Sequence, residues 1–523
     1  MLKNNSSWQV LNRKITLSIL AALATLIVLT QSNPGTVLPN RDYGFYSYIG
    51  LQVLRGNIPY KDVWESKPPA IFYLNAAALS LGRGYRWGIW LVEFAFLFAS
   101  ILVSYSLFKK LWGTTPALFG AATWLLGMNL TLQGGNYTEE YPLLFHFLSF
   151  TLLLYLIENP KQRLVNLIIG LLFSISFLFR PNNAVVEAVV ILVLGATLLW
   201  QRQWKDLFNT VLWVTLGIVI PLAITSAYFA YQGLFQDMLN ASIIYNLTYS
   251  ATDQSASSPL LVGFKFLNIT AWIGLVGYLL MFTKINEIRK SAYLPFFIAL
   301  AVDVPAVVAF SDPAKRNYGH YFMNWLPFIG VLAALAFHSI REKLFPKFNE
   351  TLFISLFFAI AIGVFVFNGN ASTYVKAIDH FFTTSDREAR SPISIYVDNH
   401  TNPGEYVLFW ATHPGENFMS HRDAPMTALF YPNMVKSDIS DRLNDQFLTE
   451  LQTKTPVLIV DMGRLTIPSL DPIRREEQKA MGVYPANPPH NLDEVLAFIE
   501  KNYYLEAEVK GRSIYRLSGT QEP

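Results

Sequence analysis

Long apolar runs separated by short polar segments occupy the first two thirds of the chain. A helix that spans the hydrocarbon core of a bilayer needs about 20 predominantly apolar residues. Runs of about this length lie at 14–31, 88–108, 114–132, 141–157, 164–180, 183–200, 208–230, 263–283, 291–310, 319–339 and 351–368. The run at 68–82 is too short to span, so we interpret it as a re-entrant or interfacial helix. The pattern predicts a mainly α, polytopic membrane protein with about 11 transmembrane helices.

The pattern changes near residue 370. Short apolar stretches typical of buried strands lie at 405–410, 456–461 and 513–517. Charged segments with helical spacing accompany them at 386–400, 436–452 and 491–502. Strands that alternate with helices favour a small α/β domain. We therefore expect a transmembrane domain at 1–368 and a soluble α/β domain at 369–523.

Composition supports a membrane protein and excludes several other classes. Of the 523 residues, 52% are hydrophobic and 15% are charged, and the mean hydropathy is +0.30. Soluble domains carry about 25% charged residues. The net charge of +3 is spread between segments, which argues against a nucleic-acid partner. The chain has no cysteine, which excludes disulfides, thiolate metal sites and a cysteine nucleophile.

Basic residues predict which loops face the cytoplasm. They occur in every second loop, at 109–110, 161–163, 202–205, 284–290 and 341–347, and in the N-terminal segment. Cytoplasmic loops carry an excess of lysine and arginine. We therefore expect a cytoplasmic N-terminus and an extracytoplasmic C-terminal domain, with a long first outer loop at 32–87. The first apolar run resembles a signal peptide, but the many spans after it favour a retained anchor.

The first outer loop holds the sharpest candidates for chemistry. Apolar residues recur at helical spacing from Arg41 onward, and Gly56 is placed to end this helix. Asp42 is a candidate general base for an acceptor hydroxyl; the alternative is an acid that interacts with the helix dipole. Lys67, held extended by two following prolines, is a candidate ligand for a lipid phosphate. The alternative is an interfacial lysine whose charge reaches the membrane surface.

Two further outer loops carry candidate residues at the ends of apolar runs. Glu139 and Glu140 could bind a metal ion, hold a sugar or cap the following helix. Arg180 lies between two apolar runs and could bind a phosphate through paired N–H groups. Its alternative role is to anchor a helix end.

The segment KRNYGHY at 315–321 is basic although it lies in a predicted outer loop. A positive cluster placed against the charge rule indicates an anionic ligand, and for Arg316 a phosphate is the natural candidate. The alternative is a topological exception. A lone histidine such as His320 is more often an interfacial residue than a ligand or a base.

These motifs together resemble the GT-C glycosyltransferases. An acid after the first span, then G-N-I-P-Y-x-D at 56–62 and K-P-P at 67–69 before an apolar helix, is similar to the group of protein O-mannosyltransferases and aminoarabinose transferases. The resemblance extends over about residues 10–368. It implies a GT-C bundle in a bacterial inner (plasma) membrane, with reaction at its outer face.

The resemblance also implies roles for the cationic and acidic loop residues. Asp42 matches the catalytic acid of the first loop, and Lys67 matches a lysine near the lipid phosphate. An acceptor hydroxyl or amine would attack the anomeric carbon in a single displacement with inversion. Lys67, Arg180 and Arg316 would stabilise charge on the leaving phosphate. Many members carry an acidic pair at the first position, whereas here Asp42 is followed by Tyr43.

Sugar and acceptor contacts follow from the same resemblance. Tyr43 and Tyr60 would stack on the sugar or line the lipid groove. Glu139 or Glu140 would match the second acidic loop, and His320 would contact sugar or acceptor. The C-terminal domain differs from those of the best-known members, so the acceptor type does not carry over.

The implied partners are a polyprenyl-phosphate-linked sugar donor, a glycan, lipid or protein acceptor, and membrane lipids. The resemblance implies no catalytic metal, although the loop acids leave a bound Mg²⁺ or Mn²⁺ as an alternative. A flippase for a lipid-linked saccharide would share many of these features, but should show broken or polar helices near the bilayer midplane. A glycan polymerase or ligase would use a diphosphate-linked donor. A scaffold would leave the charged loops unexplained.

Overall fold

The computed structural model describes residues 4–251, 257–344, 349–463 and 466–520. Contacts divide the chain into two compact units. Unit 1 comprises Met1–Asn33, Trp90–Ala227 and Gln254–Ile378, and unit 2 comprises Pro34–Ile89, Tyr228–Asp253 and Asp379–Pro523. Unit 2 therefore combines most of the predicted first outer loop with the C-terminal segment. The predicted domain boundary at residue 368 stays a prediction.

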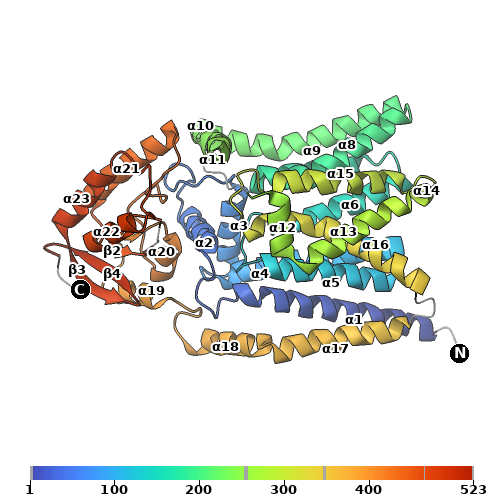
Figure 1. The fold of residues 1–523 in the computed structure, drawn as a ribbon, viewed down its shortest axis with the longest axis horizontal. Helices are drawn as coiled ribbons and strands as arrows, with labels where there is room; N and C mark the ends of the chain where they lie inside the picture. Colours follow the sequence, from blue (N-terminus) through green and yellow to red (C-terminus); the bar gives the residue numbers. More distant parts are fainter. Residues whose placement is uncertain (1–3, 252–256, 345–348, 464–465, 521–523) are drawn as a thin grey trace. The chain divides into compact units, whose positions relative to one another are not determined.

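Unit 1 is a bundle of helices (Figure 1). They are α1 (Asn4–Val28), α4 (Trp87–Trp112), α5 (Thr114–Thr131), α6 (Pro142–Glu158), α7 (Arg163–Phe179), α8 (Val185–Trp200), α9 (Trp204–Tyr231), α12 (Pro259–Leu267), α13 (Ile269–Thr283), α14 (Ile285–Ile288), α15 (Leu294–Ser311), α16 (Leu326–Leu344), α17 (Glu350–Phe367) and α18 (Asn370–Thr383). Helices α4, α9 and α18 run past the limits of the unit.

Each predicted apolar run forms helix, but not every run is long enough to span. Among the described residues, seven helices are long and apolar enough to cross a membrane, or eight if α12 and α13 form one span. That pair bends by 116° at Asn268, which has a φ of 48°. Helices α6 and α7 have only 17 residues each. A helical integral membrane protein is therefore confirmed, and the number of 11 spans stays a prediction.

Exposed side chains on α9 have the distribution expected of a lipid-facing helix. Phe208, Val211 and Ile224 are all more than half exposed along its length. Trp204 at its start is 63% exposed and Tyr231 at its end is 88% exposed. Tryptophan and tyrosine are enriched where helices cross the two membrane–water interfaces. The apolar middle and aromatic ends of α9 thus match a span.

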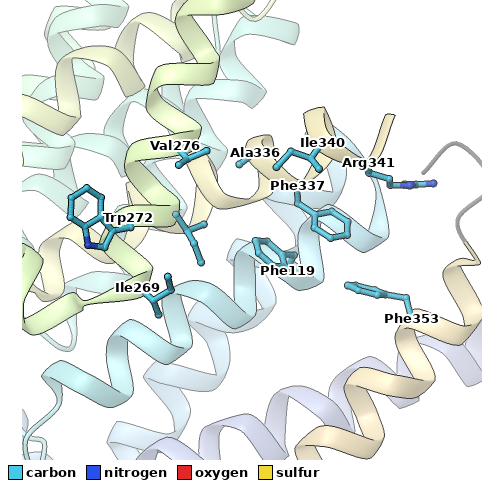
Figure 2. Close-up of a pocket in the computed structure, with 10 residues that line it drawn as sticks. Phe119, Ile269, Trp272, Val276, Ala336, Phe337, Ile340, Arg341 and Phe353 are labelled. Atoms are coloured by element: carbon cyan, nitrogen blue, oxygen red, sulfur yellow. The ribbon is translucent and has the colours of Figure 1, made fainter. Parts of the chain in front are cut away.

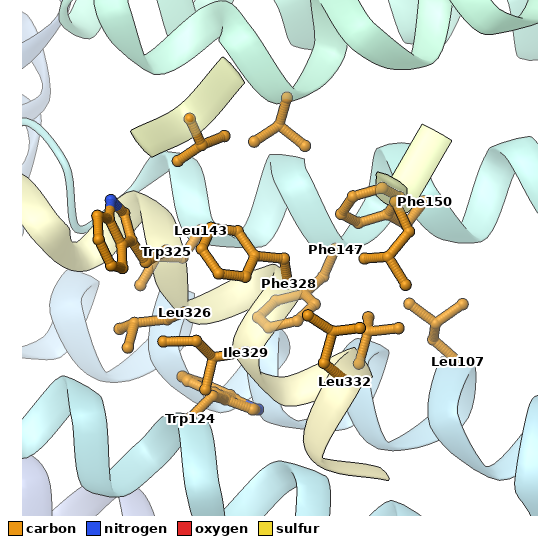
Figure 3. Packing of buried hydrophobic residues seen from close by; sticks show 14 of the residues in the cluster. Leu107, Trp124, Leu143, Phe147, Phe150, Trp325, Leu326, Phe328, Ile329 and Leu332 are labelled. Atoms are coloured by element: carbon orange, nitrogen blue, oxygen red, sulfur yellow. The ribbon is translucent and has the colours of Figure 1, made fainter. Parts of the chain in front are cut away.

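The core of unit 1 lies around α16, which packs against α5 and α13 (Figure 3). Trp124 of α5, Phe147 of α6 and Phe328 of α16 are buried there. A Cβ atom at Gly120 of α5 would lie 2.6 Å from the carbonyl oxygen of Gly330 in α16. Small residues allow such close approach of helix backbones in membranes.

Unit 2 contains two helices of the predicted first outer loop, α2 (Arg41–Leu54) and α3 (Ala70–Leu81). Asn40 caps α2, since its Oδ1 accepts from the backbone N–H of Tyr43 at 2.7 Å. Gly56 follows the helix end with a φ of 93°, a conformation that favours glycine. The predicted start and end of this helix are confirmed. Two helices, α10 (Phe235–Leu239) and α11 (Tyr245–Ala251), flank a π-helical turn in the same unit.

A four-stranded sheet forms the core of the C-terminal segment. Its order is β1 (Val407–Trp410), β2 (Leu458–Asp461), β4 (Arg512–Leu517), β3 (Tyr503–Val509), with β1 and β2 parallel and the other pairs antiparallel. Helices α19 (Pro392–Asn399), α20 (Pro414–Ser420), α21 (Asp438–Lys454), α22 (Pro472–Ala480) and α23 (Leu492–Asn502) accompany it. The three predicted strands correspond to β1, β2 and β4. The pattern missed β3, because it carries Glu506 and Glu508 and is largely exposed.

Candidate active site

Asp42 lies in the first turn of α2, but it is not the residue that caps the helix. Asn40 performs that role, and the Asp42 carboxylate lies 3.5 Å from Nε of Arg41. About 29% of the Asp42 side chain is exposed. The backbone N–H groups at a helix start favour negative charge. The position thus presents a partly exposed carboxyl group beside a guanidinium at the start of a helix.

Glu65 and Lys67 lie near this acid within unit 2. Nζ of Lys67 is 3.8 Å from Oε1 of Glu65, which also accepts a hydrogen bond from Ser66 Oγ at 3.2 Å. Burial raises the pKa of Glu65, Lys67 lowers it, and Asp42 raises it further. The Asp42 carboxylate and the Glu65–Lys67 pair are therefore close enough to interact electrostatically. We call Arg41, Asp42, Glu65 and Lys67 the first-loop cluster.

Tyr43 and Tyr60 are buried inside unit 2, with 0% and 5% of their surface exposed. The Tyr60 hydroxyl donates to the carbonyl oxygen of Lys67 at 2.8 Å, which fixes the backbone ahead of the two prolines. Its ring packs edge-on against Phe72 and Phe229. Sugar stacking by either tyrosine stays a prediction, and the observed contact gives Tyr60 a role in holding Lys67.

Glu139 and Arg180 form an ion pair within unit 1. The guanidinium carbon of Arg180 also lies 3.9 Å from the ring centroid of Tyr321, a cation–π geometry. Burial raises the pKa of Glu139, but Arg180 and then His320 outweigh it, so the pKa lies below its usual value. Glu139 is therefore ionised at neutral pH, and Arg180 is oriented from two sides.

Glu140 differs from its neighbour in charge. Its side chain is buried, and burial raises its pKa to about 8. Most Glu140 carboxyls are then protonated at neutral pH. Two adjacent acids in one loop thus differ in protonation state. Arg180 pairs with Glu139, whereas no cation is among the described groups that shift the pKa of Glu140.

His320 belongs to a stack of aromatic rings in unit 1. Its ring lies parallel to that of Tyr137 with centroids 4.0 Å apart, and Tyr318 lies parallel to its ring at 5.7 Å. Tyr321 meets the His320 ring edge-on at 4.7 Å. The stack connects the loop after α5 with the segment before α16. We call Tyr137, Glu139, Arg180, His320 and Tyr321 the outer-loop cluster.

Arg316 is half-buried in a turn that Asp312 organises. The two carboxylate oxygens of Asp312 accept from the backbone N–H groups of Arg316 and Asn317 at 2.9 and 2.8 Å. Asp312 is fully buried. The turn therefore has a fixed backbone, which limits the positions that the Arg316 side chain reaches.

A chain of buried hydrogen bonds runs from α8 to the loop of Glu139. Glu187 Oε1 lies 2.9 Å from His146 Nδ1, and His146 Nε2 lies 3.4 Å from Asn324 Oδ1. Asn324 Nδ2 donates to Asn183 Oδ1 at 3.0 Å, and Asn183 Nδ2 donates to the carbonyl oxygen of Thr138 at 2.8 Å. These five residues are all less than 8% exposed.

The nine predicted site residues divide between the two units. Unit 2 contains Asp42, Tyr43, Tyr60 and Lys67, and unit 1 contains Glu139, Glu140, Arg180, Arg316 and His320. The structure brings Asp42 and Lys67 each within electrostatic reach of Glu65, and it brings Glu139, Arg180 and His320 together. Their predicted roles stay predictions. Within the described ranges, no group of three or more His, Asp or Glu side chains is arranged to hold a metal ion.

Sequence reasoning did not assign four buried ionisable residues on the helices: Glu93, His146, Glu187 and Asp303, each 0% exposed. A signal for them was present, since each interrupts an apolar run and ionisable groups at membrane depth are costly. In the part of the chain that the structure describes, neither carboxylate oxygen of Asp303 has a hydrogen-bond partner. Glu65 was visible in the first loop, but only the fold brings it beside Lys67.

Solved structures share this fold. ArnT, an aminoarabinose transferase from Cupriavidus metallidurans, bound to undecaprenyl phosphate, has a TM-score of 0.60 and 14% identity over 97% of this chain and 98% of that chain. The apo state of that protein has a TM-score of 0.59 and 13% identity over 99% of this chain and 100% of that chain. The oligosaccharyltransferase AglB from Archaeoglobus fulgidus, in complex with an inhibitory peptide and a dolichol phosphate, has a TM-score of 0.47. It is 12% identical over 97% of this chain and 74% of that chain. The similarity to ArnT confirms the predicted similarity to GT-C glycosyltransferases at the level of the fold.

Sequence comparison gives the family. A search of the curated proteins finds no match. A family model described as "Putative competence-induced protein Ccs4 N-terminal domain" matches residues 6–348, which is well over half of the chain. This protein, with a GT-C fold, belongs to that competence-induced Ccs4 family.

Proposed function

We propose that this protein is a membrane glycosyltransferase. It transfers a sugar from a polyprenyl-phosphate donor to a hydroxyl or amine of a glycan, lipid or protein acceptor, on the outer face of a bacterial inner membrane. The observation that carries the proposal is the similarity of fold, over nearly the full length of both chains, to a transferase crystallised with undecaprenyl phosphate. The charged residues of the first-loop and outer-loop clusters supply the chemistry that such a reaction needs.

Asp42 is the proposed general base. The acceptor oxygen or nitrogen attacks the anomeric carbon and forms the new glycosidic bond, while its proton passes to a carboxylate oxygen of Asp42. The bond between the anomeric carbon and the phosphate oxygen breaks, and its electron pair leaves with the phosphate. A single displacement of this kind inverts the anomeric centre. The partly exposed carboxyl group at the start of α2, where the helix dipole favours negative charge, supports this role.

Lys67, Arg180 and Arg316 are the proposed ligands of the donor phosphate. Charge grows on the leaving phosphate in the transition state, and fixed cations stabilise it there more than in the ground state. Lys67 is restrained by Tyr60, and Arg180 by Glu139 and Tyr321. Such restraint reduces the reorganisation that phosphate binding would require.

We further propose that transfer proceeds without a bound divalent cation at the acidic loop. Hard cations such as Mg²⁺ and Mn²⁺ need ionised carboxylates. Glu139 already pairs with Arg180, and Glu140 is mostly uncharged at neutral pH. Transfer should therefore be unchanged by EDTA, and restoration of EDTA-treated enzyme by Mn²⁺ would contradict this part of the proposal.

A flippase for a lipid-linked saccharide is the second candidate. Its support is the break between α12 and α13 together with the buried ionisable groups Glu187, His146 and Asp303 on membrane helices. Transporters use broken helices and buried charges of this kind. A transferase has no evident need for Asp303.

The test compares both activities in one preparation. The purified protein is reconstituted with polyprenyl-phosphate donors that carry a radiolabelled sugar, and label passing to a membrane extract of acceptors is counted. Asp42→Asn should lower the transfer rate by about a hundredfold to ten-thousandfold. Asp62→Asn is the matched control, because Asp62 Oδ2 only accepts a backbone N–H in the same loop and an asparagine oxygen can replace it.

The same proteoliposomes report translocation of a fluorescent lipid-linked saccharide. Transfer by the wild type, lost in Asp42→Asn and kept in Asp62→Asn, supports the transferase. Translocation without transfer, unaffected by Asp42→Asn but lost in Asp303→Asn, would replace it with the flippase. Full transfer by Asp42→Asn would remove Asp42 as the base.

A further inference from the structure

An apolar cavity of about 360 Å³ opens between four helices of unit 1 (Figure 2). Helix α13 contributes Ile269, Trp272, Ile273 and Val276, which recur at the spacing of one helix face. Helix α16 contributes Ala336, Phe337, Ile340 and Arg341, and Phe119 of α5 and Phe353 of α17 complete the lining. We call these ten residues the α13–α16 groove.

The groove is apolar except at one end. Figure 2 shows Trp272 toward one end of the lining and Arg341 at the other. The α13 residues extend over about 10 Å of helix, from Ile269 to Val276. Ile269, Trp272 and Val276 are each 46–55% exposed. Exposed apolar surface on a membrane helix faces hydrocarbon, so an acyl chain is the occupant that matches this surface.

Arg341 supplies a fixed positive charge beside the acyl-chain surface. Its Nη1 donates to the neutral Thr115 Oγ1 at 3.0 Å, which holds the guanidinium near the start of α5. A guanidinium keeps its charge at every pH a cell meets. Lys343 lies in the same last turn of α16, and the neighbouring Glu342 lies within 4 Å of Lys284 and His338. Arg341 thus places a guanidinium at this end of the groove.

We propose that the α13–α16 groove binds an anionic phospholipid. One acyl chain lies along the apolar lining, and the phosphate of the headgroup lies at Arg341. Basic pockets between membrane helices are a known way of selecting anionic headgroups. The site is separate from the residues assigned to donor and acceptor, so it does not depend on the proposed transfer reaction.

Trp272 gives the proposal a direct optical test. Bromine atoms on an acyl chain quench tryptophan fluorescence only at contact. The full chain, which has 12 tryptophans, is reconstituted in brominated phosphatidylglycerol or brominated phosphatidylcholine diluted in the same unlabelled host lipid. The difference in quenching between the wild type and Trp272→Phe isolates the signal of the groove.

The expected result is a preference of about fivefold for the anionic lipid at Trp272, the effect of one basic residue near a phosphate. Arg341→Gln should abolish the preference, and Arg341→Lys should keep most of it. Lys343→Gln is the matched control, since Lys343 lies in the same turn but does not line the groove. If Arg341→Gln fails to fold, Arg341→Met takes its place, and its bound-lipid count by native mass spectrometry, compared with that of Lys343→Gln, decides between the two positions.

Three outcomes would overturn the proposal. Equal quenching by both lipids in the wild type would mean that the groove takes any acyl chain. Identical quenching of the wild type and Trp272→Phe would mean that no chain enters it. Unlabelled undecaprenyl phosphate could displace the brominated lipid and restore more Trp272 fluorescence than unlabelled phosphatidylglycerol does. That result would assign the groove to a polyprenyl chain instead.

Discussion

Nδ1 of His146 lies 2.9 Å from Oε1 of Glu187, with both side chains fully buried in the helix bundle. This pair begins the chain of hydrogen bonds that ends at the carbonyl oxygen of Thr138. Because a carbonyl can only accept, it fixes which partner donates in each hydrogen bond of that chain. Asn183 must turn its Nδ2 to that carbonyl, and Asn324 must turn its Nδ2 to Asn183. Asn324 Oδ1 then faces His146 Nε2, which carries a hydrogen. Nδ1 is then the ring nitrogen that faces the Glu187 carboxyl group.

The direction of this chain predicts unequal effects of substitution at its two ends. Glu187→Gln should be mild, because a glutamine amide can donate to Nδ1 and leave Nε2 unchanged. His146→Phe should cost about 3–5 kcal/mol of stability, since the buried Glu187 carboxyl group loses its imidazole partner and keeps the longer hydrogen bond from Ser176 Oγ at 3.3 Å. Thermal unfolding of the detergent-solubilised variants measures both. Ser149→Ala, on the same helix as His146, is the neutral control, and equal losses for Glu187→Gln and His146→Phe would refute the assigned direction.

Glu140 predicts a fall in stability as the pH rises. Its pKa is about 8 in the folded protein and 4.5 in the unfolded chain. Between these two pH values the folded state binds a proton that the unfolded state has lost. The free energy of unfolding therefore falls by about 1.4 kcal/mol for each pH unit of increase, on account of this group. The stability that the protonated Glu140 contributes is fully present below about pH 4.5 and is lost by about pH 8.

Glu140→Gln keeps the neutral shape and removes the titration. The melting temperature of the variant should therefore exceed that of the wild type increasingly from pH 5 to pH 8. A constant difference in melting temperature between the wild type and the variant from pH 5 to pH 8 would show that Glu140 does not titrate in this range.

Arg180→Lys tests the orientation of the outer-loop cation. Lysine keeps the charge but loses the planar fork and most of the stacking on Tyr321. We expect kcat/KM for the lipid donor to fall about tenfold or more, mostly through kcat, because a charge-assisted hydrogen bond that is strongest in the transition state contributes about 1.5–3 kcal/mol. Initial rates against donor concentration separate the two. An unchanged kcat/KM would remove Arg180 from the stabilisation of the donor phosphate.

Close packing of α7 on α9 predicts that Gly170 tolerates no side chain. A Cβ atom there would lie 2.2 Å from the carbonyl oxygen of Val214. Gly170→Ala should therefore separate the helices and lower the melting temperature. Gly195→Ala on α8 is the matched control, because its Cβ atom meets nothing within 4 Å. Similar melting temperatures for the two variants would contradict the observed helix contact.

The absence of cysteine makes the predicted orientation directly measurable. Ser518→Cys lies in the C-terminal segment and Gln203→Cys in a basic loop, and both positions are exposed. A membrane-impermeant maleimide should label Ser518→Cys in intact cells stripped of their outer layers. It should label Gln203→Cys only after the membrane is opened. The reverse pattern would invert the predicted topology.

The elements that the sequence predicted well are those specified by nearby residues. The apolar runs became helices because their length and composition suffice. The limits of α2 were predicted because Arg41 opens an amphipathic repeat and Gly56 adopts the positive φ that stops it. Strands β1, β2 and β4 carry enough apolar residues to be recognised without their neighbours.

Tertiary structure decided the features that depend on distant partners. The run at 263–283 is continuous in sequence, yet the chain bends by 116° at Asn268. Strand β3 exists because β4 pairs with it, not because its own residues are apolar.

The charge states show the same division most clearly. Glu139 and Glu140 are adjacent and chemically identical in the sequence. Arg180, 41 residues away, and then His320 lower the pKa of Glu139, while burial keeps Glu140 mostly protonated. A sequence by itself determines what each residue can do and where a helix can form. Burial and pairing between distant segments set the electrostatics, because both depend on the dielectric surroundings and the charges that folding brings together.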